Sequence, residues 1–269
     1  MDTRESTRDF GDVVSEFGWG SRSATGVAEG VSCGDCSHRQ KCIPAALPAR
    51  YAVSLLIPVN ARMKLSPGQT LCHQGDAAAG LYVVRSGALK SQMMSDDDRQ
   101  QIIAIHLPGE TFGAESIASG RSGGTVIALE DSEVCAISFA GLDRLTREVP
   151  AVQRWFHRAI GREMERSSEA AMRLRCVTGE KRIAGFLLDL SRRLSLAEPA
   201  LSEFRLSVCR GDIALHLGLT RETVSRAFGK LQRMRLIDGG PTWVRLCDPV
   251  RLGRAAAWAA TPAMAKRCA

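Results

Sequence analysis

Three cysteines lie within ten residues in the N-terminal part of the chain, in the stretch "CGDCSHRQKC" (residues 33–42). Cys33, Cys36 and Cys42 have the spacing C-x₂-C-x₅-C. A free cysteine is usually buried as a small apolar residue, and nothing around these three is apolar enough to bury them. Soft thiolates at such spacing bind zinc or an iron–sulfur cluster, and His38 is a further possible donor to zinc. Spacing alone leaves zinc, a cluster and unrelated thiols open.

The N-terminal sequence indicates the compartment in which these thiols act. The opening "MDTRESTRDFGDVVSEFGWG" is charged and polar and lacks the apolar stretch of a secretory signal. No run of residues approaches the roughly 18 apolar positions that a membrane helix needs. We therefore expect a cytoplasmic protein without membrane contact, in which the nine cysteines are not disulfides. Metal or redox chemistry is then the expectation for close cysteines.

A second stretch with chemical potential is "DIALHLGLTRETVSRAFGKLQRM" (residues 212–234). Gly218 ends a first apolar helix, Leu219 fills the core and Thr220 is placed to cap the next helix. The second helix carries a buried stripe of Val224, Phe228 and Leu231. Its exposed face over the first two turns carries Arg221, Glu222, Ser225 and Arg226. This is the spacing of a helix-turn-helix.

The residue types on that exposed face suit the bases of double-stranded DNA. Arginine forks onto guanine, glutamate accepts from the amino group of cytosine, and serine bonds with either kind of partner. Residues 181–254 contain 14 Lys and Arg against 7 Asp and Glu, whereas the rest of the chain has 22 of each. A basic segment beside a neutral one predicts a polyanionic partner. The other interpretation is a helical hairpin with a charged solvent face.

Short apolar stretches punctuated by glycine follow from Lys64 to about Phe139. The segments "LYVVRSGALKSQMM", "QQIIAIHLPGETFG" and "GTVIALEDSEVCAISF" predict strands, with turns at Ser86-Gly87, Pro108-Gly109 and Gly123-Gly124. The pattern is typical of an antiparallel sandwich or barrel. Residues 51–60 predict a short helix before it.

The period becomes helical from Pro150 to about Thr178. Apolar residues recur there at three-to-four spacing or twice that, at Val152, Phe156, Ile160, Met164, Ala171 and Leu174. A helix of this length between two domains often presents a seam to a second copy of itself. The alternative is a helix packed only on its own sheet. A further helix over residues 181–194 and a strand in "PTWVRL" complete the pattern.

These segments, in this order, resemble the FNR branch of the CRP family, the oxygen-responsive relatives of the cyclic-AMP receptor protein. The resemblance extends from Cys33 to Leu246 and rests on "CGDCSHRQKCIP", "LYVVRSGALK", "ALEDSEVCAI" and "FRLSVCRGDIALHLGLTRETVSR". It implies an α+β fold with an antiparallel β-roll of the cyclic-nucleotide-binding type, a long dimerisation helix and a C-terminal winged helix-turn-helix. The expected segments are an N-terminal arm (1–50), the β-roll sensor domain (51–149), the dimerisation helix (150–178), the DNA-binding domain (179–255) and a tail (256–269).

The resemblance also implies a cofactor. In that family a [4Fe-4S] cluster is ligated by three N-terminal cysteines and one on the sensor domain, which match Cys33, Cys36, Cys42 and Cys135. We expect Cys135 at the end of a strand. The intact cluster favours a homodimer, and oxygen converts the cluster to a smaller form that weakens the dimer. The expected function is an oxygen-responsive transcription regulator, not an enzyme, that controls anaerobic genes through palindromic TTGAT-type sites.

The chain departs from well-known FNR members at three places. Lys41 replaces an apolar residue beside Cys42, which bears on oxygen sensitivity. Ser167 matches a position that is acidic in some members, so the apo form is expected to dimerise more readily. Arg221, as in CRP, is combined with Ser225, as in FNR, which predicts some tolerance of CRP-like TGTGA half-sites.

The sequence supports three other functions less well. A zinc-stabilised DNA-binding protein would sense nothing, and an enzyme using the cysteines as a redox pair has no catalytic motif to support it. A CRP-like response to cyclic nucleotide needs a phosphate-binding arginine. Arg121-Ser122 in "FGAESIASGRSGG" faintly matches that pattern, but Ala114 replaces its glutamate. The acidic loop "SDDDRQQ" (residues 95–101) is a candidate contact for RNA polymerase or simply a solvated loop.

Overall fold

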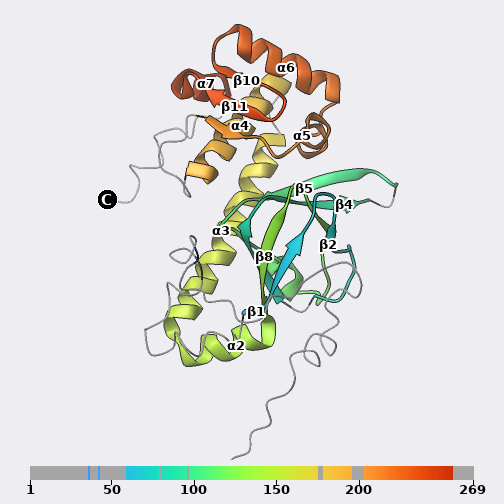
Figure 1. The fold of residues 1–269 in the computed structure, drawn as a ribbon, viewed down its shortest axis with the longest axis vertical. Coiled ribbons are helices and arrows are strands. Elements are labelled where there is room, and N and C mark those ends of the chain that lie inside the picture. Colours follow the sequence, from blue (N-terminus) through green and yellow to red (C-terminus); the bar gives the residue numbers. More distant parts are fainter. Residues whose placement is uncertain are drawn as a thin grey trace, which may run out of the picture.

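The computed structural model describes residues 36, 42, 59–78, 80–95, 97–174, 178–195 and 203–256. A domain of strands comes first, a long helix follows, and a smaller domain of helices with a short sheet completes the described chain (Figure 1). None of the helices in these ranges has the length and apolar character needed to cross a membrane.

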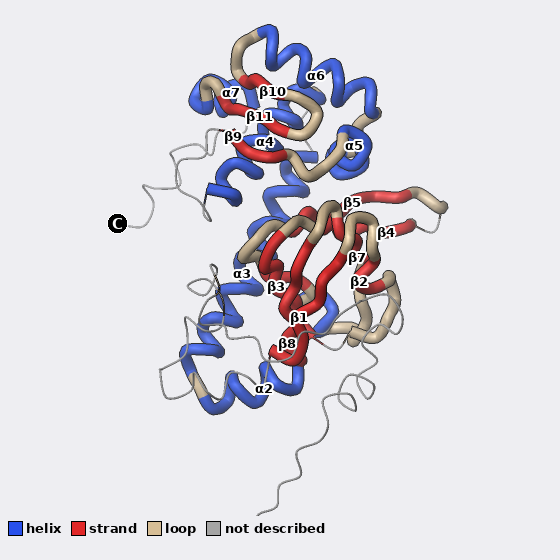
Figure 2. The backbone as a smooth tube through the Cα atoms, viewed as in Figure 1, coloured by secondary structure: helices blue, strands red, loops and turns tan. Residues whose placement is uncertain are grey.

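The β-domain consists of eight strands in two antiparallel sheets (Figure 2), with orders β1-β8-β3-β6 and β2-β7-β4-β5. The predicted antiparallel β-roll is confirmed. The strands are β1 (Val59–Leu65), β2 (Thr70–Cys72), β3 (Gly80–Ser86), β4 (Leu89–Met94), β5 (Gln100–His106), β6 (Thr111–Phe112), β7 (Thr125–Ala128) and β8 (Ser132–Ser138), with a short 3₁₀ helix η5 (Ala114–Ile117) between β6 and β7.

The predicted turn at Ser86-Gly87 joins β3 to β4 and depends on its glycine. Gly87 has φ +77°, a conformation that side chains with a Cβ rarely adopt. A Cβ at this position would lie 2.3 Å from the hydroxyl oxygen of Ser132 and 2.5 Å from the carbonyl oxygen of Asp131. The close approach of the turn to the start of β8 therefore requires glycine.

The N-terminal edge of the β-domain differs from the prediction. Residues 59 and 60 begin β1 instead of ending a helix, and residues 51–58 lie outside the described chain. A helix that was not predicted, α2 (Phe139–Glu148), follows β8 directly. The hydroxyl of Ser138 caps it by accepting a hydrogen bond from the Gly141 N–H at 3.1 Å.

The long helix α3 (Pro150–Leu174) lies within the predicted 150–178 segment, whose last residue, Thr178, is in a bend; residues 175–177 lie outside the described chain. Its first half packs on the β-domain and α2 through Val152, Trp155 and Ala159. The predicted apolar stripe differs in burial along the helix, because Val152 is buried on the β-domain whereas Met164 is 66% exposed.

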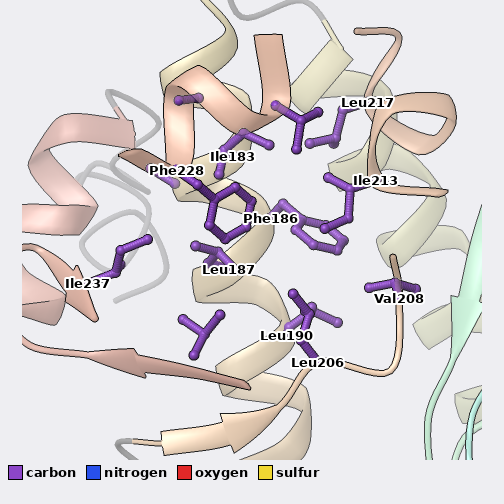
Figure 3. Packing of buried hydrophobic residues seen from close by; sticks show 14 of the residues in the cluster. Ile183, Phe186, Leu187, Leu190, Leu206, Val208, Ile213, Leu217, Phe228 and Ile237 are labelled. Carbon is purple, nitrogen blue, oxygen red and sulfur yellow. The ribbon is translucent and has the colours of Figure 1, made fainter. Parts of the chain in front are cut away.

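The C-terminal domain has a three-stranded antiparallel sheet of order β10-β11-β9. Its elements are α4 (Gly179–Ser195), β9 (Glu203–Arg205), α5 (Arg210–Leu217), α6 (Arg221–Arg233), β10 (Ile237–Gly239), β11 (Trp243–Leu246) and α7 (Pro249–Ala256). Phe186 of α4, Ile213 of α5 and Phe228 of α6 point into one core (Figure 3). The same core includes Ile102 and Ile105 of β5, so the two domains share buried apolar surface.

The predicted C-terminal helices and the strand in "PTWVRL" are present, whereas β9 and β10 were not predicted. Ala256, where the predicted tail begins, is the last residue of α7 and is buried. The positions after it lie outside the described chain.

Candidate nucleic-acid interface and cysteine site

Helices α5 and α6 form the predicted helix-turn-helix. Gly218 ends α5 with φ +60°, and its N–H donates to the carbonyl of Ala214. Leu219 packs against the core, as expected. The hydroxyl of Thr220 caps α6 by accepting from the Thr223 N–H at 3.2 Å. The turn between the helices is thus fixed by the residues that the sequence indicated.

The side chains of Arg221, Glu222, Ser225 and Arg226 are all exposed on the first two turns of α6, whereas Val224 and Phe228 are buried beneath them. Glu222 accepts from its own backbone N–H and from the Thr220 hydroxyl. These bonds, with the charges of Arg221 and Arg226, lower the pKa of Glu222. A carboxylate that stays ionised is an acceptor only, as an amino group of cytosine requires.

An arginine that the sequence did not single out lies beneath this surface. The guanidinium of Arg210, the first residue of α5, lies 3.2 Å from the ring centroid of Phe228. Burial lowers the pKa of Arg210 to about 10. This cation–π contact joins the two helices, so Arg210 positions α5 against α6. No spacing rule in the sequence pairs these two residues.

Two of the predicted cluster ligands pack against the same part of the apolar core. Cys42 and Cys135 both pack against the apolar cluster made by β3, β8, α2 and α3, which includes Ile137, Leu142 and Trp155. Cys135 lies in the middle of β8, between β1 and β3, and not at the end of a strand as predicted. Its backbone is therefore held on both sides.

The other two predicted ligands are less well defined. Cys36 is half-exposed, and Cys33 lies outside the described chain. Within the described ranges, no group of three or more His, Cys, Asp or Glu side chains is close enough to hold a metal ion. Of the four predicted ligands, the structure thus places Cys42 and Cys135 against the same apolar cluster.

Arg121 and Ser122, the faint match to a phosphate-binding pair, make contacts within the β-domain. Arg121 is an exposed loop residue, as predicted, and its Nη1 donates to the carbonyl of Gly75 at 2.8 Å. The hydroxyl of Ser122 donates to the carbonyl of Gly124 at 2.8 Å. Inside the β-domain, the Phe112 ring stacks between Tyr82 and His106.

Two family models match the chain, the Cyclic nucleotide-binding domain over residues 62–148 and the Crp-like helix-turn-helix domain over residues 181–255. The Transcriptional activator protein Anr of Pseudomonas protegens is 36% identical over 220 residues, which cover 82% of this chain and 90% of Anr. The chain belongs to the CRP/FNR family of transcription regulators. As a member of this family it binds DNA through its helix-turn-helix and is not an enzyme.

Other CRP/FNR members are similar over most of the chain. The Fumarate and nitrate reduction regulatory protein of Escherichia coli is 35% identical over 77% of this chain and 83% of its own length. The Transcriptional regulatory protein btr of Bordetella pertussis is 36% identical over 80% of this chain and 89% of its own length. The structure of FixK2 from Bradyrhizobium japonicum superposes with a TM-score of 0.65 at 28% identity, covering 72% of this chain and 96% of FixK2.

Proposed function

We propose that this CRP/FNR regulator is an oxygen-responsive switch for anaerobic gene expression in the cytoplasm. In this proposal Cys33, Cys36, Cys42 and Cys135 hold a [4Fe-4S] cluster, and the loaded protein binds palindromic DNA as a homodimer. The relatives named Anaerobic regulatory protein and Fumarate and nitrate reduction regulatory protein support this assignment.

The observation that carries the proposal is the shared packing environment of Cys42 and Cys135. These thiols are far apart in the sequence, yet both pack against the apolar cluster of β8, α2 and α3. Four thiolates are the donor set that a cubane cluster prefers, and the cluster would supply redox reactivity toward oxygen. Cys135 provides a ligand on a strand that is paired on both sides, so binding would draw the N-terminal arm onto the β-domain.

The second half of α3 offers the surface for the homodimer. Met164, Met172 and Leu174 are all at least 39% exposed, whereas the first half of the helix buries Val152 and Trp155. Apolar side chains on one long helix are typical of a helix pair. Ser167 and Ala171 bury little area, so the dimer would be marginal and a few kcal/mol would shift its equilibrium.

The exposed start of α6 supplies the contacts with DNA. We assign guanine recognition to the Arg226 side chain and cytosine recognition to Glu222, with Ser225 as the third FNR-like residue of a TTGAT-type half-site. Arg221 is the CRP-like residue and would allow some TGTGA half-sites. Of the predicted loop over residues 95–101, the last two residues belong to β5, and the part before them, in which Arg99 is 85% exposed on its side chain, is our candidate contact for RNA polymerase.

Two observations favour this function over a response to cyclic nucleotide. Arg121 would have to leave the Gly75 carbonyl to reach a phosphate, and Ala114 provides no carboxylate for a ribose. Zinc bound to the same thiols would stabilise the arm without responding to oxygen. Analysis of which metal the protein contains distinguishes a zinc site from an iron–sulfur cluster.

The deciding experiment is analysis of iron and acid-labile sulfide in protein purified under nitrogen, with sedimentation before and after exposure to air. We expect about four irons and four sulfides per chain, from the cluster type, and a dimer that weakens in air. Zinc in place of iron, or the same dimer in both conditions, would contradict the proposal.

A further inference from the structure

A set of buried polar contacts, which we call the joint, connects the β-domain with the C-terminal domain of the same chain. Helix α5 lies against strand β5 at this boundary (Figure 1), and the end of α4 reaches the same sheet. The joint comprises Lys90, Gln101, Ile102, Ile105 and Glu110 of the β-domain with Arg193, Asp212, Leu215 and His216 of the C-terminal domain.

Arg193 has the largest number of contacts in the joint. From α4 its Nε donates to Oε1 of Glu110 at 2.8 Å, and its Nη2 donates to Oε2 of the same carboxylate at 2.7 Å. Nη2 also donates to the Ile105 carbonyl, and Nη1 lies 3.2 Å from Asp189. The side chains of Arg193 and Glu110 are only 12% and 14% exposed. A forked, buried arginine of this kind fixes direction as well as distance.

The remaining contacts satisfy backbone groups on both sides of the boundary. Strand β5 is the last strand of its sheet, and its Ile102 carbonyl accepts from Nδ1 of His216 at 3.0 Å. In the opposite direction, the amide of Gln101 donates to the Leu215 carbonyl at the end of α5. Lys90 and Asp212 form an ion pair at 2.7 Å. A rotation of the C-terminal domain would leave these buried groups without partners, which is costly.

We propose that the joint sets the orientation of the C-terminal domain in each protomer and thereby selects the spacing between DNA half-sites, with Arg193 as its central positioning residue. This inference rests on the proposed homodimer. Pairing of α3 fixes the distance between two β-domains, and the joint then fixes where each α6 points from its own β-domain.

The geometry of DNA makes spacing sensitive to such an angle. Two recognition helices must reach successive major grooves about 34–36 Å apart on one face of the duplex. Helix α3 ends at Leu174 and α4 begins at Gly179, so the covalent connection is short and alone leaves the angle free to vary. Among the described residues, that angle is tied to the β-domain by the joint, by the apolar core that the two domains share, and by a hydrogen bond from Ser207 to Glu130 at 2.9 Å.

The test is a selection from DNA in which two fixed half-sites are separated by spacers of every length over one helical turn. The full chain is used anaerobically as wild type, Arg193→Met and Arg193→Lys. The matched control is Glu180→Gln, which removes an exposed ion pair with Lys230 at 3.0 Å inside the C-terminal domain. Sedimentation of the same samples reports the oligomeric state.

We expect the wild type and the control to prefer one spacing. In Arg193→Met this preference should fall about fivefold or more, the lower end of typical coupling between sites. Arg193→Lys should be intermediate, because an ammonium retains the charge but not the fork. The dimer should persist in all four proteins.

Two results would overturn the inference in different ways. A dimeric Arg193→Met that loses affinity equally at every spacing, or a dimeric wild type without a preferred spacing, refutes the role of the joint alone. A monomeric wild type refutes the homodimer and removes the basis for spacing with it. If Arg193→Met does not fold, the double variant Lys90→Met/Asp212→Asn removes another buried pair of the joint and must lower the preference in the same way.

Discussion

The four side chains proposed to contact DNA lie within six consecutive positions of α6, whereas the four cysteines of the proposed cluster come from positions 33 to 135. The first site is complete once α6 folds on its core, because Thr220 caps it and Phe228 anchors it. The second site needs a strand of the β-domain and a separate N-terminal segment to come together.

This difference separates a site that is built locally from one that is assembled. A local site is lost when its own segment unfolds, and the rest of the molecule stays intact. An assembled site fails whenever one segment is released, and for that reason it is suited to a switch. Variants at the two sites should therefore have distinct effects on iron content, DNA affinity and folding.

The largest effect is expected for Cys135→Ala. Removal of the ligand on β8 should abolish nearly all iron binding and, through loss of the dimer, lower DNA affinity by about 5- to 150-fold, from the coupling typical of linked sites. The control is Cys72→Ala, a half-buried thiol of the same domain that lies 3.5 Å from the Ser122 hydroxyl. Full iron content in Cys135→Ala would refute the ligand assignment.

Phe228→Ala should damage only the local site. This ring is buried in the C-terminal core and stacks with Arg210, so its removal should cost about 3–5 kcal/mol of unfolding free energy. Urea denaturation measures the loss, and iron content under nitrogen should stay at the wild-type value. A parallel loss of iron would show that the two sites are not independent.

Arg226→Ala should weaken DNA binding without a change in folding or iron content. Loss of one forked base contact costs about 1–3 kcal/mol, or roughly 5- to 150-fold in affinity, and should relax the preference at one base pair. Arg254→Ala on α7 removes the same charge away from α6 and is the control. Equal losses in both variants would indicate that only net charge matters.

Low pH should destabilise the protein through two histidines, His216 at the boundary between the domains and His106, which is buried inside the β-domain. Burial, reinforced by Arg173 and Arg193, lowers the pKa of His216 to about 4, and burial lowers that of His106 to about 3. In the unfolded chain these histidines take up protons below about pH 6.5, whereas in the folded protein they stay neutral. The free energy of unfolding therefore falls as the pH decreases from about 6.5 toward 4.

The expected loss is about 2 kcal/mol per histidine between pH 7 and pH 5. Urea denaturation at several pH values measures it, and His216→Gln should show a shallower dependence. An unchanged slope in that variant would mean that His216 does not carry the effect.

The smallest effect is expected for Ser167→Asp on the exposed side of α3. Two like charges across the proposed helix pair should weaken the dimer by about 0.5–1 kcal/mol at low salt, and added salt should reduce the effect. Sedimentation equilibrium of the loaded protein measures this change. A dimer that tolerates aspartate at this position would place the seam elsewhere on α3.

The features that could be predicted from the sequence are those that depend on neighbours in the chain. Helices α5 and α6, their cap at Thr220 and the turn at Gly87 all follow from local rules, and all are present. Helix α2 also has a local signal in Ser138 followed by Leu142 and Leu145, but the strand pattern continues to Phe139 and masks it.

Features that depend on distant segments could not be predicted. The side chains of Arg193 and Glu110 meet across two domains, and no pattern in the sequence relates them. The burial along α3 could not be predicted for the same reason, because a helical period does not reveal which part of a helix a sheet will cover. The cysteine site lies between these cases: its spacing suggested a metal or cluster, but the fourth ligand came only from resemblance.

The covering of β5 by α5 has a consequence for work with fragments. In the whole chain the C-terminal domain shields the outer side of this last strand, where Ile102 and Ile105 present carbonyls. A β-domain produced alone would expose that side to solvent and to other molecules of itself. Such a fragment would tend to self-associate through added strands, so oligomers formed by it would say little about how the intact protein pairs.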